Sequence, residues 1–147
     1  MKPGVRVVGL SMQRGAAMHE SLQAGHPVPV EELPTLADSL GGGIGLTNRH
    51  TFAMVRALVD EVLLVSEAEI AAGIRHAYCE ERQVIEGAAA VGIAALLGAP
   101  PPQWGTTIAL LSGGNIDMAL HQRIVAGETP DLLAERQAAT VKDARHA

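Results

Sequence analysis

The stretch LLSGGNID, Leu110–Asp117, places small polar residues directly after an apolar run. Ser112 and Asn115 offer a hydroxyl and an amide for hydrogen bonds, while Gly113 and Gly114 let the backbone approach a ligand closely. If the apolar run is a parallel strand, its carboxyl end opens on the crevice where α/β sheets bind ligands, beside the N–H groups of the following helix. A tight strand-to-helix turn capped by Asn115 explains the same residues equally well.

Two other places carry candidate chemistry. The stretch ADSLGGGIG, Ala37–Gly45, has four glycines in five positions, which is typical of a backbone that wraps a ligand or of a flexible linker. It lacks the lysine of a GxxxxGK[ST] phosphate loop. Glu86 precedes an almost wholly apolar segment, so its carboxylate either faces a polar site or occupies the first turn of a helix. The histidines are scattered without ligand spacing, so no zinc site is predicted.

The elements that would position these residues alternate in type. Strands are expected at short apolar runs, namely Val5–Leu10, Glu61–Val65 and Thr106–Leu111. Helices are expected over Arg14–Ala24, Thr47–Val59, a segment capped by Ser66 with Glu69 at the capping-box position, Val84–Gly98 and Ile116–Ala126. Because each strand is an unbroken apolar run, the pattern predicts an α/β domain with a mostly parallel sheet flanked by helices.

Composition excludes several classes of partner. The chain has 147 residues, of which 48% are hydrophobic, enough for one domain with one core. Its net charge of −5, with no basic stripe, argues against nucleic acid. No apolar run is long enough for a membrane span or a signal peptide. The single cysteine, Cys79, rules out an intrachain disulfide and fits a cytoplasmic protein.

The order of five stretches resembles the carboxyl-terminal half of the serine/threonine dehydratase family, which are pyridoxal-phosphate enzymes of the tryptophan-synthase-β-like fold. These stretches are VRVVGLSM, PTLADSLGGGIG, DEVLLVSEAEI, VIEGAAAVGIAALL and ALLSGGNID. Within the family, RGAAMHESL and PTLADSLGGGIGLTNRHTF are most similar to the dehydratase-like branch of hydroxyectoine utilisation. The resemblance implies an incomplete half of that fold, with residues 1–127 as part of the large domain and 128–147 as a polar tail or surface helix.

The resemblance also implies the residues that contact the cofactor. They are Ser112, Gly113, Gly114, Asn115, Glu86 and Ser39. In the family, the serine at the position of Ser112 hydrogen-bonds the pyridine nitrogen of pyridoxal 5'-phosphate. A neutral hydroxyl does not enforce protonation of the ring, which favours β-elimination over transamination. Ser11 and Ala17 stand where some relatives have acidic ligands for a divalent cation, so no metal site is predicted.

The lysine that forms the Schiff base in this family has no counterpart here. The chain has two lysines, Lys2 and Lys142, and neither matches the family's motif. No catalytic residue is therefore predicted in this chain, and we expect it to be inactive alone. The complete enzyme would be an ammonia-lyase or dehydratase that acts on a β-hydroxy amino acid, with a complementary amino-terminal half as partner and a homo-oligomeric assembly.

Two other hypotheses fit the same sequence. The chain could be a non-catalytic remnant or protein-interaction module, whose open sheet edge and uncovered apolar face promote association. It could also be a small phosphate-binding α/β domain that uses SGGN as its cradle. The absence of a basic residue near the glycines weakens this last hypothesis.

Overall fold

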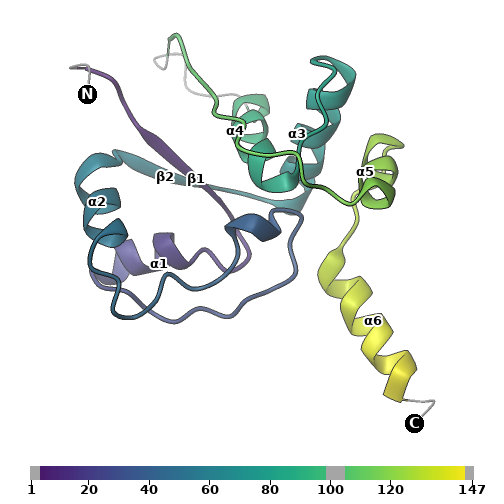
Figure 1. Ribbon diagram of the computed structural model, residues 1–147, viewed down its shortest axis with the longest axis horizontal. Helices are drawn as coiled ribbons and strands as arrows, with labels where there is room; N and C mark the ends of the chain where they lie inside the picture. Colours follow the sequence, from purple (N-terminus) through teal and green to yellow (C-terminus); the bar gives the residue numbers. More distant parts are fainter. Residues whose placement is uncertain (1–3, 99–104, 145–147) are drawn as a thin grey trace.

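The computed structural model describes residues 4–98 and 105–144 (Figure 1). The elements are β1 (Val8–Met12), α1 (Ala17–Ala24), the 3₁₀ turn η1 (Asp38–Leu40), α2 (Thr51–Leu58), β2 (Glu61–Val65), α3 (Glu67–Cys79), α4 (Gly87–Leu97), α5 (Met118–Val125) and α6 (Leu132–Ala144). Figure 1 shows α1 and α2 on one side of the strand pair, and α3 and α4 on the other. The fold is α/β, with a small parallel sheet flanked by helices, as the sequence predicts. None of the described helices is long and apolar enough to span a bilayer.

The strands β1 and β2 lie in parallel, in a register that runs from Val8 opposite Glu61 to Met12 opposite Val65. Within each strand only the last residue is buried, so the carboxyl ends enter the core while the amino ends lie nearer to solvent. The predicted strand at Glu61–Val65 is confirmed. This polarity places the loops that follow both strands next to the packed helices.

The start of α3 is fixed by a capping box. The Ser66 hydroxyl accepts the Glu69 backbone N–H at 3.3 Å, and the Glu69 carboxylate accepts the Ser66 backbone N–H at 2.7 Å. The Ser66 hydroxyl also donates to that carboxylate at 2.7 Å. These hydrogen bonds from Ser66 favour the ionised form and lower the pKa of Glu69. The predicted capping box is confirmed.

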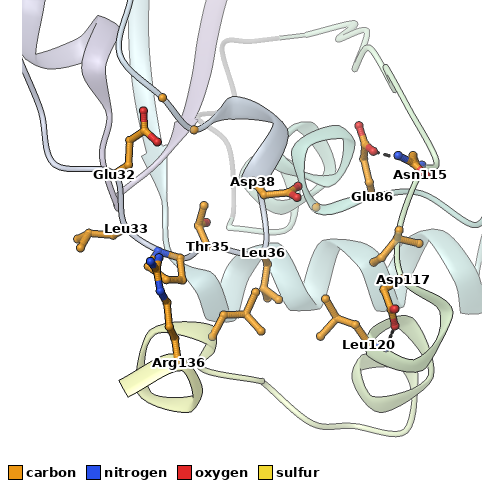
Figure 2. Close-up of a pocket in the computed structure, with 16 residues that line it drawn as sticks. Glu32, Leu33, Thr35, Leu36, Asp38, Glu86, Asn115, Asp117, Leu120 and Arg136 are labelled. Atoms are coloured by element: carbon orange, nitrogen blue, oxygen red, sulfur yellow. Dashed lines mark hydrogen bonds between the residues drawn. The ribbon is translucent and has the colours of Figure 1, made fainter. Parts of the chain in front are cut away.

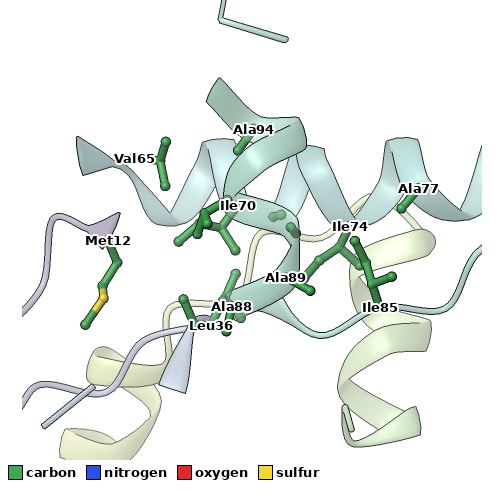
Figure 3. Close-up of a cluster of buried hydrophobic side chains, with 14 of the residues drawn as sticks. Met12, Leu36, Val65, Ile70, Ile74, Ala77, Ile85, Ala88, Ala89 and Ala94 are labelled. Atoms are coloured by element: carbon green, nitrogen blue, oxygen red, sulfur yellow. The ribbon is translucent and has the colours of Figure 1, made fainter. Parts of the chain in front are cut away.

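The core lies mainly between α3 and α4 (Figure 3). The buried side chains that these two helices contribute are small or β-branched, namely Ile70, Ala71, Ile74, Ala77, Ala88, Ala89, Ala90, Val91 and Ala94. Gly73 brings the two backbones together, since a Cβ there would lie 2.7 Å from the carbonyl oxygen of Ala90. The alanine-rich composition therefore serves close contact between helices.

Several helices begin later than predicted, for local reasons. Gly15 has a φ of +70°, which is incompatible with a helical start at Arg14. The Asn48 side chain accepts the backbone N–H of Phe52 at 3.0 Å, so α2 begins beyond Asn48. The Asn48 side chain thus satisfies a backbone N–H in the first turn of α2, and the helix starts later than the spacing of apolar residues predicts.

The predicted strand at Thr106–Leu111 is wrong for the chain as described, because this segment has no regular secondary structure. A strand requires a neighbour for its backbone N–H and C=O groups, and β1 and β2 are the strands within the described residues. Ile108 is 91% exposed and Leu110 is 82% exposed. The apolar pattern is real, but nothing in the described part of the chain covers it.

Candidate functional site

A cavity of about 480 Å³ lies beside the amino-terminal end of α4. Its walls are the loop 32–42, the first residues of α4, the segment 115–120 and one face of α6 (Figure 2). The volume falls within the range of roughly 300–1,000 Å³ that is usual for small-molecule sites. It is therefore the natural place to look for the predicted site residues.

Glu86 joins two of these walls. It is the residue immediately before α4, and its carboxylate both lines the cavity and accepts the Asn115 backbone N–H at 3.2 Å (Figure 2). Its own backbone N–H donates to the carbonyl oxygen of Gly113 at 3.2 Å. The sequence allowed two environments for this carboxylate, the start of a helix or a polar site. In the structure, Glu86 lies immediately before α4 and its side chain also lines the cavity.

The loop that contains Ser112 is held against the chain by its glycines. A Cβ at Gly113 would lie 2.5 Å from a carboxylate oxygen of Glu86, and one at Gly114 would lie 2.9 Å from the Val84 carbonyl oxygen. Ser112 itself is exposed and does not line the cavity, and its hydroxyl forms no hydrogen bond with a described residue. The two glycines thus let the loop pack against Glu86 and the Val84 carbonyl, while the Ser112 hydroxyl remains exposed to solvent.

Ser39 lies on the exposed turn η1, where its backbone N–H donates to the Asp38 carboxylate at 2.8 Å. Asp38 lines the cavity, whereas Ser39 does not. Of the six predicted cofactor-binding residues, the structure therefore brings Glu86 and Asn115 to the cavity wall. Gly113 and Gly114 form the loop next to them, and the two serines lie on the exposed surface.

Hydrogen bonds to Glu67, called here the Glu67 clamp, hold the loop 32–42 in place, and no sequence pattern predicts them. The Glu67 carboxylate accepts the Thr35 hydroxyl at 2.6 Å with one oxygen and the Leu36 backbone N–H at 2.7 Å with the other. The Thr35 hydroxyl in turn accepts the Ala37 backbone N–H at 3.2 Å. On the opposite side, a Cβ at Gly87 would lie 1.9 Å from the Leu36 carbonyl oxygen. The loop is thus held between the first residues of α3 and α4.

Arg14 ties the same loop to the segment that leads into α6. Its guanidinium donates to the Pro34 carbonyl oxygen at 3.1 Å and pairs with Asp131 at 2.9 Å. The backbone N–H of Ala134 and the Arg14 side chain lower the pKa of Asp131. No local sequence pattern points to this contact, because the partners lie 20 and 117 residues from Arg14.

The charge of the cavity is predominantly negative. Its lining includes four carboxylates and one guanidinium, namely Glu32, Asp38, Glu86, Asp117 and Arg136. Such a surface repels a doubly charged phosphate group and accepts a ring or an ammonium group more readily. Within the described residues, no group of three or more His, Cys, Asp or Glu is arranged to hold a metal ion.

A pyridine-type cofactor fits this arrangement only in part. The open Ser112 hydroxyl, fixed through the anchored loop, can donate to or accept from an aromatic nitrogen. The predominantly negative lining disfavours a phosphate group inside the cavity. Together, the described residues form an α/β domain with a cavity of small-molecule size at the start of a helix.

Comparison with known proteins identifies the family. The family model for "Pyridoxal-phosphate dependent enzyme" matches residues 1–113, and the chain therefore belongs to this family, whose cofactor is pyridoxal phosphate. A protein of Sinorhizobium fredii named "Putative threonine dehydratase" is 59% identical over 128 residues, which cover 86% of this chain and 39% of that protein. The L-threonine ammonia-lyase of Thermotoga maritima is 37% identical over 125 residues, covering 85% and 31% respectively.

Solved structures agree with this assignment. The crystal structure of a T.th. threonine deaminase is 34% identical with a TM-score of 0.63, covering 80% of this chain and 42% of that one. The processed form of threonine deaminase isoform 2 from Solanum lycopersicum is 28% identical with a TM-score of 0.70, covering 86% and 38%. The predicted dehydratase family and its fold are confirmed. The chain spans between about a third and two fifths of the length of these relatives.

Proposed function

We propose that this chain carries the ring-facing part of a pyridoxal-phosphate-dependent ammonia-lyase, which dehydrates and deaminates a β-hydroxy amino acid when the rest of the fold is present. The family match and the relatives named for threonine dehydration support the reaction class. The structural observation that carries the proposal is the anchored loop Ser112–Asn115, which leaves the Ser112 hydroxyl exposed and unpaired with described residues.

Ser112 would hold the cofactor ring and tune it. When bound, pyridoxal phosphate supplies the electron sink of the reaction. A neutral hydroxyl at the ring nitrogen does not force a proton onto that nitrogen, so the sink is weaker than with a carboxylate partner, and elimination is favoured. Glu86 positions Ser112 indirectly, since its carboxylate and backbone hold the loop at Asn115 and Gly113.

The covalent attachment of the cofactor is assigned to a second part of the fold. Lys142 lies on α6 and does not line the cavity, while Lys2 lies outside the described residues. The acidic lining is unsuited to the phosphate group. A complementary amino-terminal portion would therefore bring both the lysine and the phosphate cradle, and this chain alone would be inactive.

The finer assignments follow from the resemblance. Residues 1–127 would form part of the large domain, and 128–147 a peripheral segment that includes α6. The substrate would be a small β-hydroxy amino acid, with hydroxyectoine breakdown as the setting suggested by RGAAMHESL and PTLADSLGGGIG. The single cysteine favours a reducing, cytoplasmic location, and a homo-oligomer is the expected assembly.

The proposal is tested by joining this chain to the portion of the Sinorhizobium fredii relative that it does not match, and assaying the fused protein with pyridoxal phosphate. Release of ammonia and 2-oxo acid from L-threonine and L-serine is expected. Ser112→Ala should lower kcat by at least about tenfold, as for loss of one hydrogen bond that acts in the reaction. Thr47→Ala, a change of another exposed hydroxyl, should have no effect. A fused protein that binds the cofactor without turning over either substrate would refute the proposal.

A non-catalytic interaction module is the second candidate, and the exposed segment 105–111 favours it. It predicts that the fused protein, or the complex formed in trans, assembles without turnover. The phosphate-binding alternative has less support, because the lining of the cavity carries four carboxylates against one guanidinium.

A further inference from the structure

Helix α6 is attached to the rest of the chain through its first turns. Leu132 packs against the core and Leu133 is half-buried, whereas residues 134–142 are exposed. Figure 1 shows the later turns of α6 projecting away from the other helices. A helix attached at one end has few buried apolar contacts, so its position depends on the groups around its first turns.

The same first turns form one wall of the cavity. Leu132 and Arg136 lie one turn apart on α6, and both line the cavity. Figure 2 shows the Arg136 side chain rising from α6 toward Leu33 of the opposite loop. If α6 moved away, the cavity would lose this wall, and the apolar side chains of Leu36 and Leu120 would become more accessible.

Arg123, near the end of α5, holds α6 through a bidentate ion pair. Its Nη2 and Nη1 donate to the two carboxylate oxygens of Glu135, at 2.6 and 3.3 Å. Its Nε donates to the carboxylate of Glu128, in the linker between the two helices, at 2.8 Å. The hydrogen bonds from Arg123 lower the pKa of Glu135. A planar guanidinium fixes the direction of such a contact as well as its length.

Arg14 holds the residue that precedes α6. Its Nη2 pairs with the Asp131 carboxylate at 2.9 Å. The same carboxylate accepts the backbone N–H groups of Leu133 and Ala134, at 3.1 and 3.3 Å, so it caps the helix that it tethers. A second ion pair therefore acts on the start of α6, from a residue far away in the sequence.

The linker between α5 and α6 is fixed almost up to the helix. Arg75 of α3 donates to the carbonyl oxygens of Ile124 and Glu128, at 3.2 and 2.8 Å. Thr129 is exposed and Pro130 is buried, so the chain is anchored until the residue before Asp131. A change in the direction of α6 would thus pivot at the start of the helix.

We propose that α6 is a strap across the cavity, closed by the ion pairs Arg123–Glu135 and Arg14–Asp131, and that solutes enter when these two latches release. The carboxylates of both latches are exposed, so dissolved salt screens them directly. Exposed ion pairs contribute little each, which suits a contact that has to open. The strap controls access to the cavity whatever reaction takes place there, so this inference goes beyond the proposed function and does not rest on it.

The position of α6 is measured on the full chain with two spin labels. One is attached to Cys79, the exposed native cysteine at the end of α3, and the other to the variant Gln137→Cys on α6. Double electron–electron resonance should give one dominant distance at low salt. Raising the salt to about 1 M should increase the population of other distances, because the screening length falls to about 3 Å.

Removing one latch should open the strap without salt. Arg123→Gln and Glu135→Gln should each raise the population of other distances about two- to fivefold, as for one exposed ion pair. The double variant should add little, because both changes remove the same pair. Glu20→Gln on α1 and Arg56→Gln on α2 are matched controls, since they neutralise exposed charges elsewhere, and they should leave the distances unchanged.

Access to the cavity is measured separately, in a Cys79→Ser background. The labelling rate of Leu120→Cys by a methanethiosulfonate reagent should rise about two- to fivefold when Arg123→Gln is added. In the parent chain, Arg123→Gln should leave the labelling rate of Cys79 unchanged, because Cys79 is exposed and does not line the cavity.

Three results would overturn the proposal. The first is an unchanged distance distribution after a latch is removed. The second is a changed distribution with an unchanged labelling rate of Leu120→Cys, because α6 would then not limit access. The third is a loss of helical circular dichroism in the Arg123→Gln and Glu135→Gln variants, which would show that α6 unfolds instead of moving as a helix. Each of these measurements is made without cofactor or turnover, so failure of the proposed reaction would leave the strap unaffected.

Discussion

The helix pair α3–α4 and the segment 105–111 are both rich in aliphatic residues and opposite in burial. In the helix pair, Ile74 is fully buried and Gly73 brings the backbones into contact. In segment 105–111, Ile108 has the same side chain but is 91% exposed. The difference shows that an apolar run predicts side chains suited to burial, whereas the elements that pack against the run determine whether they are buried. Within the described residues, the helix pair is covered and segment 105–111 is not.

The largest expected effect comes from truncating the same residue type in both regions. Ile74→Ala should lower the free energy of unfolding by about 2–5 kcal/mol, because it leaves a cavity in the core. Ile108→Ala should change it by less than about 0.5 kcal/mol. Denaturant unfolding of both variants measures the contrast, and comparable losses at the two positions would contradict the assigned burial.

A second change targets the contact between the loop wall and α4. Gly87→Ala places a Cβ against the Leu36 carbonyl oxygen and should cost about 1–3 kcal/mol or more, since the backbone must move. Gly98→Ala, at the other end of α4, meets its nearest atom at an ordinary 3.5 Å and serves as control. If the two variants unfold at the same denaturant concentration, the loop is not seated as described.

The clamp at Glu67 should have an intermediate effect. Glu67→Gln replaces one accepting oxygen by a donor and leaves either the Thr35 hydroxyl or the Leu36 N–H poorly satisfied, at a cost of about 1–2 kcal/mol. Amide exchange at Leu36 and Ala37 should accelerate, whereas Glu20→Gln on the exposed face of α1 should leave it unchanged. Unaltered exchange at both amides would show that Glu67 does not hold the loop.

The smallest effect is expected at the capping box. Ser66→Ala should cost about 1 kcal/mol near neutral pH, because the Glu69 N–H loses its partner. The pKa of Glu69 lies below its ordinary 4.5 in the folded protein, so its contribution is present above that pH and is lost as the pH falls through the lowered value. The stability difference between the variant and the parent chain should therefore shrink on acidification below about pH 4.5. A difference that stays constant would contradict this origin.

The sequence predicted well what short-range chemistry determines. The strand Glu61–Val65 and the capping box of Ser66 and Glu69 depend on neighbouring residues and are present as expected. The clamp between Glu67 and the loop joins residues 31 and 32 positions apart, and no local pattern records it. The strand predicted at Thr106–Leu111 failed for a different reason, because the described chain provides no neighbouring strand.

For the site, the sequence likewise indicated the local motif but not the contacts around it. The motif around Ser112 indicates the loop and its glycines, and the family resemblance implies that Glu86 lies near the site. The glycines are required by contacts with Glu86 and Val84, which only the three-dimensional structure reveals. The acidic lining from Asp38 and Asp117 was also missed, because each of these residues appears in sequence as part of an ordinary turn or helix start.

We propose that this chain holds one part of a dehydratase site and needs the remaining part of the fold to act. The decisive measurement is ammonia release from L-threonine, with pyridoxal phosphate present, for the chain alone and for the fused protein. We predict no release by the chain alone and turnover by the fused protein that falls on Ser112→Ala. Turnover by the chain alone would contradict the claim, as would a cofactor-loaded fused protein without activity.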